Sequence, residues 1–547
     1  MKRLFLPLVL SLLVPVIIGA AYFGRVFDPS LKGRDVANYT RKIPLGVVRG
    51  ALLDRKGRPL TLPDVRWKVI QFNLRRDIEE ADLNGLRILV GHDFKTKRYR
   101  YLGFSEIKGL SQEEIYTVMK YRPFFKSIEV VPTVRHRLVC KECFHTIGRV
   151  TSDGEGMFGL EKLYNDYLKG ELGHVLLKVD AYGNLIDEPK ILIYHNPRDL
   201  RTYLDLDLYR LVDSLMAPYR RGAAFAFNPK TGEVYLVYSK PGPYDTAASP
   251  GDSPLLNRAI AGLYPPGSTF KPLVALLALK YGVIDTTFGV GCHGYVYLGR
   301  RKFRCWSVHG YTRLRKAITW SCNVFFYNVG TRFGPRRFIK AVWDSHLFGR
   351  RLTPLPEEVP SRFPRRARHY GSVLNYAIGQ GEILVTPVFL SVEAGLIGNG
   401  GWVVLPRFSP LDRPETLRVE APEWAYEKVK EGMLGVVEEG TAALSRIPGF
   451  RYGGKTGTAQ NPHGDDHSLF IAFAPYDDPT FAVAVVVENA GHGSSAAAPI
   501  AAMLIRRWFG LKDLPLYYAW KLAPRVEERD TIDRLRLLDE IEVETGM

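Results

Sequence analysis

The chain reads YPPGSTFKP at residues 264–272, where a hydroxyl nucleophile, Ser268, precedes an amine, Lys271, by three residues. On a helix this spacing puts both side chains on one face, close enough to exchange a proton. Two prolines suit a helix start, because the first turn needs no backbone donors there, and Gly267 permits a sharp bend before it. We therefore expect Ser268 in the first helical turn, where the positive end of the helix dipole favours an alkoxide.

Two later motifs complete a set with this stretch. Taken alone, Ser-x-x-Lys is also compatible with an ordinary helix start that carries an exposed lysine. The chain continues with Ser321-Cys322-Asn323 and, much later, with Lys455-Thr456-Gly457-Thr458. Ser-x-x-Lys, Ser-Asp-Asn and Lys-Thr-Gly occur together in β-lactamases and penicillin-binding proteins. Only Cys322 departs from this set, and we expect its side chain to point away from the site as a small packed residue.

The set supplies the groups that acyl transfer needs. A serine hydroxyl is a poor nucleophile until a base removes its proton, and Lys271 can serve if burial beside a second cation, Lys455, lowers its pKa. Ser321 can relay a proton between the lysines and a leaving amine. The amide of Asn323 can hold a substrate peptide bond. Which group acts as the base in acylation stays open at this point.

The Lys-Thr-Gly segment predicts how the substrate is held. We expect it to form an edge strand in which Gly457 lets another backbone approach closely. The hydroxyls of Thr456 and Thr458 can bind a terminal carboxylate. The backbone N–H groups of Ser268 and Thr458 form the candidate oxyanion hole. This mechanism requires neither a metal nor an organic cofactor.

On these motifs the chain resembles the penicillin-binding proteins, and the similarity extends beyond them. Other segments look like the family's transpeptidase strands and its Gly-Gln-Gly segment: residues 221–234, 377–387, 466–475 and 480–489. The resemblance implies an α/β fold of the α+β type, with an antiparallel sheet between helices. It also implies a serine D,D-transpeptidase that acts on peptidoglycan stem peptides. β-Lactams should acylate Ser268, because their strained amide mimics the donor.

The N-terminal half narrows the family. RGALLDRKG at residues 49–57 resembles a motif of class B enzymes, and residues 159–170 are similar to their Gly-Leu-Glu segment. No glycosyltransferase domain fits before residue 205, which argues against class A. Cys305-Trp306, His309-Gly310 and the aromatic run after Asn323 look like penicillin-binding protein 2. That family makes side-wall peptidoglycan with a RodA-type polymerase of the SEDS family, and the division-type class B transpeptidase is the close alternative.

Three further functions share part of these features. In a D,D-carboxypeptidase or a β-lactamase, water replaces the acceptor amine. The pedestal domain that we expect at residues 25–200 and the membrane anchor that we expect at residues 4–24 argue against both. A β-lactam sensor would need several membrane spans or a cytoplasmic signalling domain. The third function is a scaffold that activates a polymerase through the pedestal, and this role can coexist with catalysis.

Charge and hydropathy indicate a membrane setting. The chain of 547 residues has a net charge of +18. Its Lys and Arg residues are spread along the sequence without a recognisable nucleic-acid module, so we expect an anionic membrane surface nearby rather than a nucleic acid. A thermophile's charged surface is the plainer alternative. No Asp, Glu, Lys or Arg occurs from Leu4 to Phe23, a length that spans a bilayer as a helix.

Lys2 and Arg3 precede this apolar run and favour a cytoplasmic N-terminus. A cleaved signal peptide is the alternative, although the run is long for one. We expect a single-pass protein of the cytoplasmic membrane with its catalytic domain on the outer side. The predicted segments are a cytoplasmic stub (1–3), a transmembrane helix (4–24), a pedestal domain that contacts the polymerase (25–200), a transpeptidase domain (201–510) and a charged tail (511–547).

The five cysteines fit an extracytoplasmic protein. CKEC at residues 140–143 has His136 and His145 beside it, but a zinc knuckle would need a second pair of ligands. We expect a local disulfide or free thiols there, and no metal. Cys292 and Cys305 flank a hairpin-like segment and could pair with each other.

Overall fold

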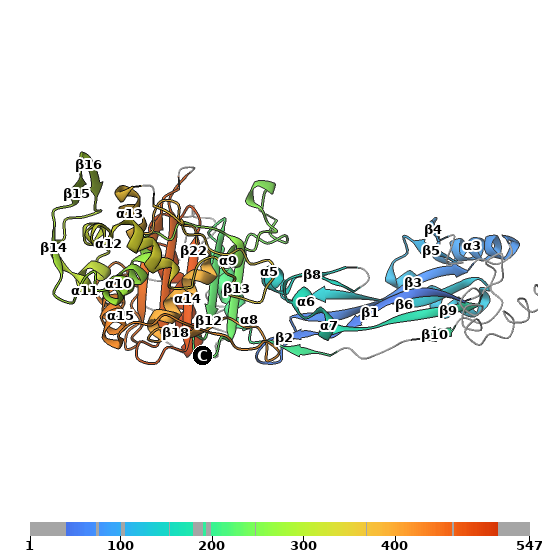
Figure 1. The fold of residues 1–547 in the computed structure, drawn as a ribbon. Coiled ribbons are helices and arrows are strands. Elements are labelled where there is room, and N and C mark those ends of the chain that lie inside the picture. The colour runs from blue at the N-terminus through green and yellow to red at the C-terminus, as the bar shows by residue number, and fades with distance from the viewer. Residues whose placement is uncertain are drawn as a thin grey trace, which may run out of the picture.

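The structure is a computed structural model that describes residues 40–72, 76–99, 104–151, 154–178, 190–192, 198–246, 248–367, 369–461 and 464–511. The expected stub and transmembrane helix lie outside these residues, as does the tail beyond residue 511. Among the helices of the described ranges, none is both long and apolar enough to cross a membrane. Figure 1 shows a broad body that carries the C-terminal half of the chain, with a slender N-terminal extension beside it.

A five-stranded sheet forms the centre of the body. Its order is β13-β12-β22-β21-β20, and each neighbouring pair is antiparallel. The strands are β12 (Gly222–Phe227), β13 (Val234–Lys240), β20 (Gly453–Ala459), β21 (His467–Ala474) and β22 (Phe481–Val487). The Lys-Thr-Gly segment is therefore the edge strand that the sequence predicted.

Helices cover both faces of this sheet. One face contacts α8 (Leu206–Met216) and α16 (Ala497–Phe509), and the other contacts α14 (Pro387–Gly398). Along β22, Phe481 stacks on Trp508 of α16 with ring centroids 5.4 Å apart, whereas Ala482 lies against Gly395 of α14. Alternate residues of a strand point to opposite faces, so a strand between two helical layers must be apolar throughout. This explains the sequence FAVAVVV and confirms a strand within residues 480–489.

Further helices and three two-stranded sheets complete the body, and β14, β15 and β16 lie at its end away from the pedestal (Figure 1). β14 pairs with β17, and β15 pairs with β16. The helices are α9 (Arg258–Ala261), α10 (Lys271–Lys280), α11 (Leu314–Thr319), α12 (Asn323–Trp343), α13 (Tyr370–Ala377) and α15 (Glu423–Glu438). The strands are β14 (Gly289–Cys292), β15 (Tyr295–Leu298), β16 (Arg301–Arg304), β17 (Gly310–Arg313), β18 (Trp402–Val404) and β19 (Thr416–Arg418).

The N-terminal extension, which we call the pedestal, consists of described residues within the range 25–200 that the sequence analysis assigned to a pedestal domain. Two sheets run along it, β1-β9-β10 and β4-β5-β3-β6. Its longer elements are β1 (Thr40–Arg49), β3 (Thr61–Phe72), α3 (Arg76–Val90), β4 (Lys95–Tyr99), β5 (Phe104–Lys108), α4 (Gln112–Tyr121), β6 (Ile128–Leu138), β9 (Lys169–Lys178) and β10 (Lys190–Leu192). Ser111 and Glu114 form a capping box at the start of α4.

Short elements join the pedestal to the body. They are β2 (Leu52–Leu53), α5 (Phe144–Ile147), β7 (Arg149–Val150), β8 (Gly156–Phe158), α6 (Gly159–Leu163), α7 (Asn165–Leu168) and β11 (Leu200–Arg201). The buried side chain of Arg49 pairs with Glu161 at 2.8 Å, which links the two class B motifs. Arg58 contacts both Asp54 and Asp207 at 2.7 Å.

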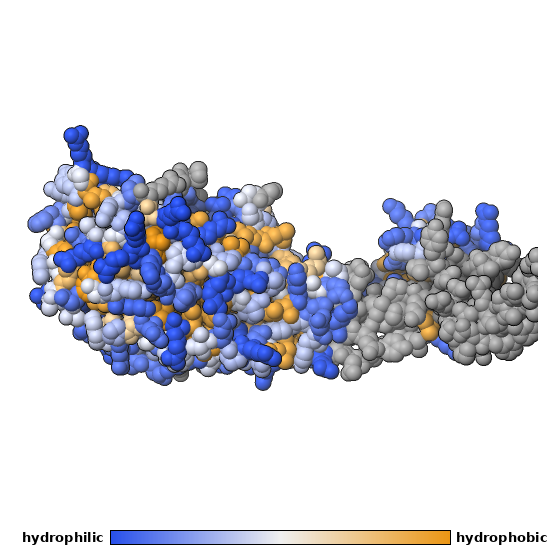
Figure 2. All heavy atoms as spheres, in the orientation of Figure 1, coloured by the Kyte–Doolittle hydropathy of each residue, from blue (hydrophilic) through white to orange (hydrophobic). Residues whose placement is uncertain are grey.

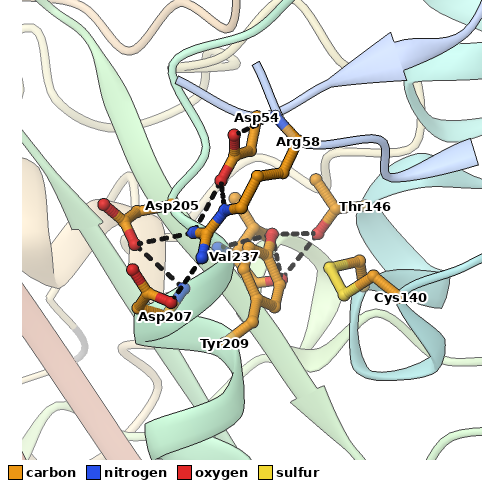
Figure 3. The surroundings of a disulfide bond; sticks show 9 residues. Asp54, Arg58, Cys140, Thr146, Asp205, Asp207, Tyr209 and Val237 are labelled. Atoms are coloured by element: carbon orange, nitrogen blue, oxygen red, sulfur yellow. Dashed lines mark hydrogen bonds and ion pairs between the residues drawn. A yellow bond between two sulfur atoms is a disulfide. The ribbon is translucent and has the colours of Figure 1, made fainter. Parts of the chain in front are cut away.

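Cys140 and Cys143 form a disulfide in this junction (Figure 3). The sequence left open whether these two cysteines form a local disulfide or stay free thiols, and the structure has the disulfide. The hydroxyl of Thr146, close by on α5, donates to the carbonyl of Val237 in β13 at 2.6 Å and accepts from Tyr209 at 2.9 Å. The junction is therefore hydrogen-bonded to the first strands of the catalytic sheet.

Candidate active site

Ser268 is half-buried in the 3₁₀ turn η4 (Gly267–Phe270), which continues directly into α10. The N–H of Lys271 donates to the carbonyl of Ser268 as the helix begins. The expected α-helical first turn is thus a tighter 3₁₀ turn, and Pro272 occupies the first turn of the α-helix instead. Short 3₁₀ turns are common where an α-helix begins.

Lys271 is fully buried beside the Ser-Cys-Asn motif. Its ammonium donates to the carbonyl of Ser321 at 2.8 Å, to the hydroxyl of Ser321 at 3.1 Å and to Oδ1 of Asn323 at 2.7 Å. Burial lowers the pKa of Lys271 to about 8, because these oxygens carry no full charge to compensate for lost water. Within the described residues, no hydrogen bond joins Ser268 Oγ to this amine, as is common before a substrate binds.

The turn between α11 and α12 aims the middle motif at the lysine. Ser321 has a φ of +54°, a left-handed backbone conformation that residues other than glycine seldom adopt. Its oxygen atoms thereby reach Lys271. Asn323 follows as the first residue of α12, where its amide group donates to the carbonyl of Arg304 at 3.3 Å. Such backbone strain costs energy and is found where a site requires a fixed geometry.

Lys455 occupies β20 and is also fully buried. Its ammonium donates to the carbonyl of Thr456 at 3.0 Å. Burial, and then the positive charge of Lys271, lower the pKa of Lys455 well below its ordinary value. We expected burial beside Lys455 to lower the pKa of Lys271; burial does lower it, whereas the charge effect falls on Lys455.

Two glycines let the serine turn lie against the edge strand. A Cβ on Gly457 would come within 2.8 Å of Thr269 Cγ2 and 3.0 Å of the carbonyl oxygen of Pro266. A Cβ on Gly267, which has a φ of +53°, would lie 2.5 Å from the carbonyl oxygen of Thr458. The close backbone approach that Gly457 predicted is therefore present, and the approaching segment is the turn that carries the nucleophile.

Three residues outside the predicted set contact the two threonines of β20. Thr441 shares a hydrogen bond of 2.7 Å with Thr456, and Nδ1 of His492 lies 3.5 Å from the hydroxyl of Thr458. Gln380 donates to the carbonyl of Thr458 at 3.2 Å. Gln380 belongs to the Gly-Gln-Gly segment and could have been found from the sequence. Thr441 and His492 lie in loops with no local signal, and only the tertiary fold brings them to β20.

A cysteine–histidine cluster lies directly behind the middle motif. Ligand atoms of Cys292, Cys305, His309 and Cys322 all lie within 4.8 Å of one another. Cys292 and Cys305 are free thiols, so the disulfide considered for them is wrong in this structure. Cys322 is buried as expected, with its side chain in this cluster. Three thiols and one imidazole form a set that tetrahedral zinc binds in proteins, and the sequence analysis did not predict it.

The thiol of Cys305 links this cluster to the catalytic residues. Its sulfur accepts a hydrogen bond from the N–H of Asn323 at 3.2 Å. A hydrogen bond from Cys322 lowers the pKa of Cys305, which favours the thiolate form that binds metals. The side chains that could bind an ion thus also fix the start of α12.

Comparisons with known proteins show the family of this chain. The profile of the penicillin binding protein transpeptidase domain matches residues 222–506. Peptidoglycan D,D-transpeptidase MrdA of Acinetobacter baumannii is 32% identical over 62% of this chain and 58% of its own length, and MrdA of Haemophilus influenzae is 27% identical over 90% and 88%. The structure of penicillin-binding protein PBP2 with MreC from Helicobacter pylori covers 87% of this chain and 99% of that chain, with 23% identity and a TM-score of 0.74.

The chain belongs to the penicillin-binding protein transpeptidase family. Within it, the relatives place the chain with the class B, PBP2-type D,D-transpeptidases that the sequence motifs predicted. The structural neighbour shows the same fold along almost its whole length, pedestal included.

Proposed function

We propose that this protein cross-links peptidoglycan stem peptides during cell-wall elongation, through an acyl-enzyme on Ser268. The observation that carries the proposal is the environment of Lys271. This lysine is fully buried, holds a pKa of about 8 and contacts both functional residues of the middle motif. A buried amine of this kind is partly neutral near pH 7 and can accept a proton from the adjacent serine turn.

The reaction follows from these groups. The neutral amine of Lys271 accepts the hydroxyl proton of Ser268 while Oγ attacks the carbonyl between two terminal D-alanines. The N–H groups of Ser268 and Thr458 stabilise the oxyanion. The peptide C–N bond then breaks, and a proton passes through Ser321 to the leaving D-alanine. An amine from a neighbouring strand attacks the ester, gives up a proton and restores the free serine.

Labelling with a fluorescent penicillin, followed by mass spectrometry, tests the nucleophile. We expect one adduct on the wild-type protein, none on Ser268→Ala, and unchanged labelling of Ser307→Ala, an exposed serine on the loop before His309. An adduct on Ser268→Ala would overturn the assignment. A well-folded wild-type protein that stays unlabelled would contradict the acyl-enzyme and favour the scaffold function.

The cellular setting is part of the proposal. We infer that residues 4–24 anchor the chain in the cytoplasmic membrane and that the body works on its outer side. The uncharged run and the two cations before it support this topology. Protease added to intact spheroplasts should degrade the body, and protection of the body until the membrane is broken would contradict the topology.

A RodA-type SEDS polymerase is the proposed partner, supported by the class B motifs of the pedestal. The pedestal presents an apolar cavity of about 450 Å³ between α3 and the end of α4. Its rim exposes 84% of Ile88 and 79% of Phe124, unusually high values for large apolar side chains. Ile88→Glu should weaken co-purification with the polymerase, while Ile284→Val in the body should not. If both variants recovered equal amounts of the polymerase, this surface of the pedestal would not be its binding site.

Zinc binding is a second candidate function, favoured by the cysteine–histidine cluster. We propose that Cys292, Cys305, His309 and Cys322 hold one zinc ion that braces the turn before Asn323. The ion would join the hairpin strands to the middle motif and would be structural, since all four ligands come from the protein.

Elemental analysis of protein purified with reduced thiols tests the zinc site. About one zinc per chain is expected for the wild type and for a Cys140→Ser/Cys143→Ser control. The Cys292→Ser/Cys305→Ser variant should lose it. When cobalt replaces zinc, the wild type and the control should show thiolate-to-metal absorption, and the Cys292→Ser/Cys305→Ser variant should not. Metal-free wild-type protein, or equal zinc in both double variants, would refute the site.

A further inference from the structure

The positive charge of this chain is concentrated beside the active site rather than spread evenly. Residues 286–343 contain 11 Lys and Arg and no Asp or Glu, so they account for 11 of the 18 net positive charges. All 11 are exposed. The Lys and Arg residues themselves are spread along the chain, and the local excess of net charge arises because this stretch lacks Asp and Glu. A surface of one sign attracts ligands of the other sign and raises their local concentration.

The densest part of this surface is a lobe formed by residues 289–316, which we call the basic lobe. It contains the hairpins β14–β17 and β15–β16 at the far end of the body (Figure 1). Its tip is the turn at Arg300, Arg301 and Lys302, and the projection at the upper left of Figure 2 is hydrophilic. Within the described residues, the lobe's only recorded ion pair joins Arg315 to Glu439. The tip cations are therefore available to an external anion.

Aromatic side chains lie among these cations. Tyr295, Tyr297, Trp306 and Tyr311 are each between 41% and 62% exposed. The ammonium of Lys302 lies 3.9 Å from the ring centre of Tyr295 and 6.0 Å from that of Tyr297. Tyr and Trp are enriched at binding surfaces, and exposed rings that gather in one place mark a surface that binds a ligand or partner. Cations beside flat apolar rings suit a ligand that has both carboxylates and ring-shaped, partly apolar units.

The basic lobe is continuous with the catalytic residues. The indole N–H of Trp306 donates to the carbonyl of Trp320 at 3.1 Å and to that of Ser321 at 3.3 Å. The carbonyl of Arg304, which ends β16, accepts from Asn323 at 3.3 Å. A polymer on the lobe would therefore reach the middle motif without leaving the surface.

We propose that the basic lobe binds the peptidoglycan strand that is being cross-linked. Its aromatic rings lie against the sugars, and its guanidinium and ammonium groups bind the carboxylates of the stem peptides. This inference rests on the proposed function, since it states how the polymeric substrate of that reaction is held. Anionic lipid is disfavoured, because the lobe lies at the opposite end of the molecule from the start of β1 (Figure 1).

The test measures co-sedimentation of full-length protein with purified, insoluble peptidoglycan. All variants carry Ser268→Ala so that no turnover occurs. The charge reversal Arg300→Glu/Arg301→Glu/Lys302→Glu should weaken binding about tenfold. The control Arg413→Glu/Arg418→Glu/Arg446→Glu makes the same change in net charge at exposed residues outside the lobe, and it should bind like the parent. Equal weakening in both would show a net-charge effect and overturn the inference.

Two parallel measurements separate this inference from the proposed function. With Ser268 restored, the lobe variant should react with benzylpenicillin within about twofold of the wild-type rate, because the drug needs only the acylation site. Normal acylation with undiminished peptidoglycan binding would refute the lobe and leave the function intact. If the wild-type protein bound peptidoglycan through the lobe but was never acylated, the proposed function would be refuted and the lobe would stand. If the lobe variant lost binding to phosphatidylglycerol vesicles or single-stranded DNA but kept its binding to peptidoglycan, the inference would also be overturned.

Discussion

The active site and the pedestal junction both bury charge, but they do so in opposite ways. Lys271 and Lys455 are fully buried, and their acceptors are carbonyl, hydroxyl and amide oxygens. Arg49 in the junction is equally buried, but it faces the carboxylate of Glu161. A buried cation without a counter-charge tends to lose its proton, whereas a paired one keeps it. The first arrangement produces a base, and the second holds two parts of a chain together.

The largest expected effect comes from removing the unpaired cation. Lys271→Met should lower the rate of penicillin acylation about 10³-fold, because the general base is lost. Its melting temperature should stay equal or rise, since an apolar side chain of similar length replaces a buried charge. Stopped-flow acylation and thermal unfolding measure both, with Lys280→Met at the other end of α10 as the control. A large loss of stability would show that the lysine is structural.

Breaking the paired cation should have the converse result. Glu161→Ala leaves Arg49 buried without its counter-charge and should reduce the free energy of unfolding by about 3–5 kcal/mol. Glu80→Ala, which removes an exposed ion pair of α3 with Arg76, should cost no more than about 0.5 kcal/mol. Denaturant titration compares the two. Similar losses would mean that burial does not distinguish the pairs.

The pH dependence of acylation sharpens the contrast further. Lys271 is protonated and inactive below its pKa of about 8, so the rate should rise with pH. Between pH 6 and pH 8 the neutral fraction, and with it the second-order rate constant, should rise roughly 50-fold. A rate that is flat over this range would assign the base to another group.

The smallest expected effect lies in the pedestal. Ser111→Ala removes the N-cap of α4 and should cost about 1 kcal/mol of stability without changing acylation. Thr117→Ala, in the middle of the same helix and exposed, should change stability by less than about 0.5 kcal/mol. Denaturant midpoints decide between them, and an acylation defect in Ser111→Ala would reveal coupling between pedestal and site.

Sequence alone predicted what local patterns encode. The uniform apolar run of β22 and the Ser111–Glu114 box of α4 each identify one element, and the three motifs identify most of the site. Local patterns did not reveal Thr441 or His492, because these depend on which loops the fold places together, whereas the charge of the basic lobe is visible in the sequence and only its place beside the site needs the fold. The cysteine cluster was missed for the same reason, since Cys322 was assessed without knowledge of its neighbours.

The open edge of β20 has a consequence for what the protein recognises. Within the described residues, β20 has a neighbouring strand on one side only, and the carbonyls of Thr456 and Thr458 accept from the side chains of Lys455 and Gln380. Natural proteins usually cover or charge such an edge, because it attracts extended chains. At β20 the open edge could instead serve for recognition. An extended peptide that docked there as a sixth strand would be bound through its main chain. The main chain of such a peptide would supply affinity, and selectivity would come from the pockets that meet its alternate side chains.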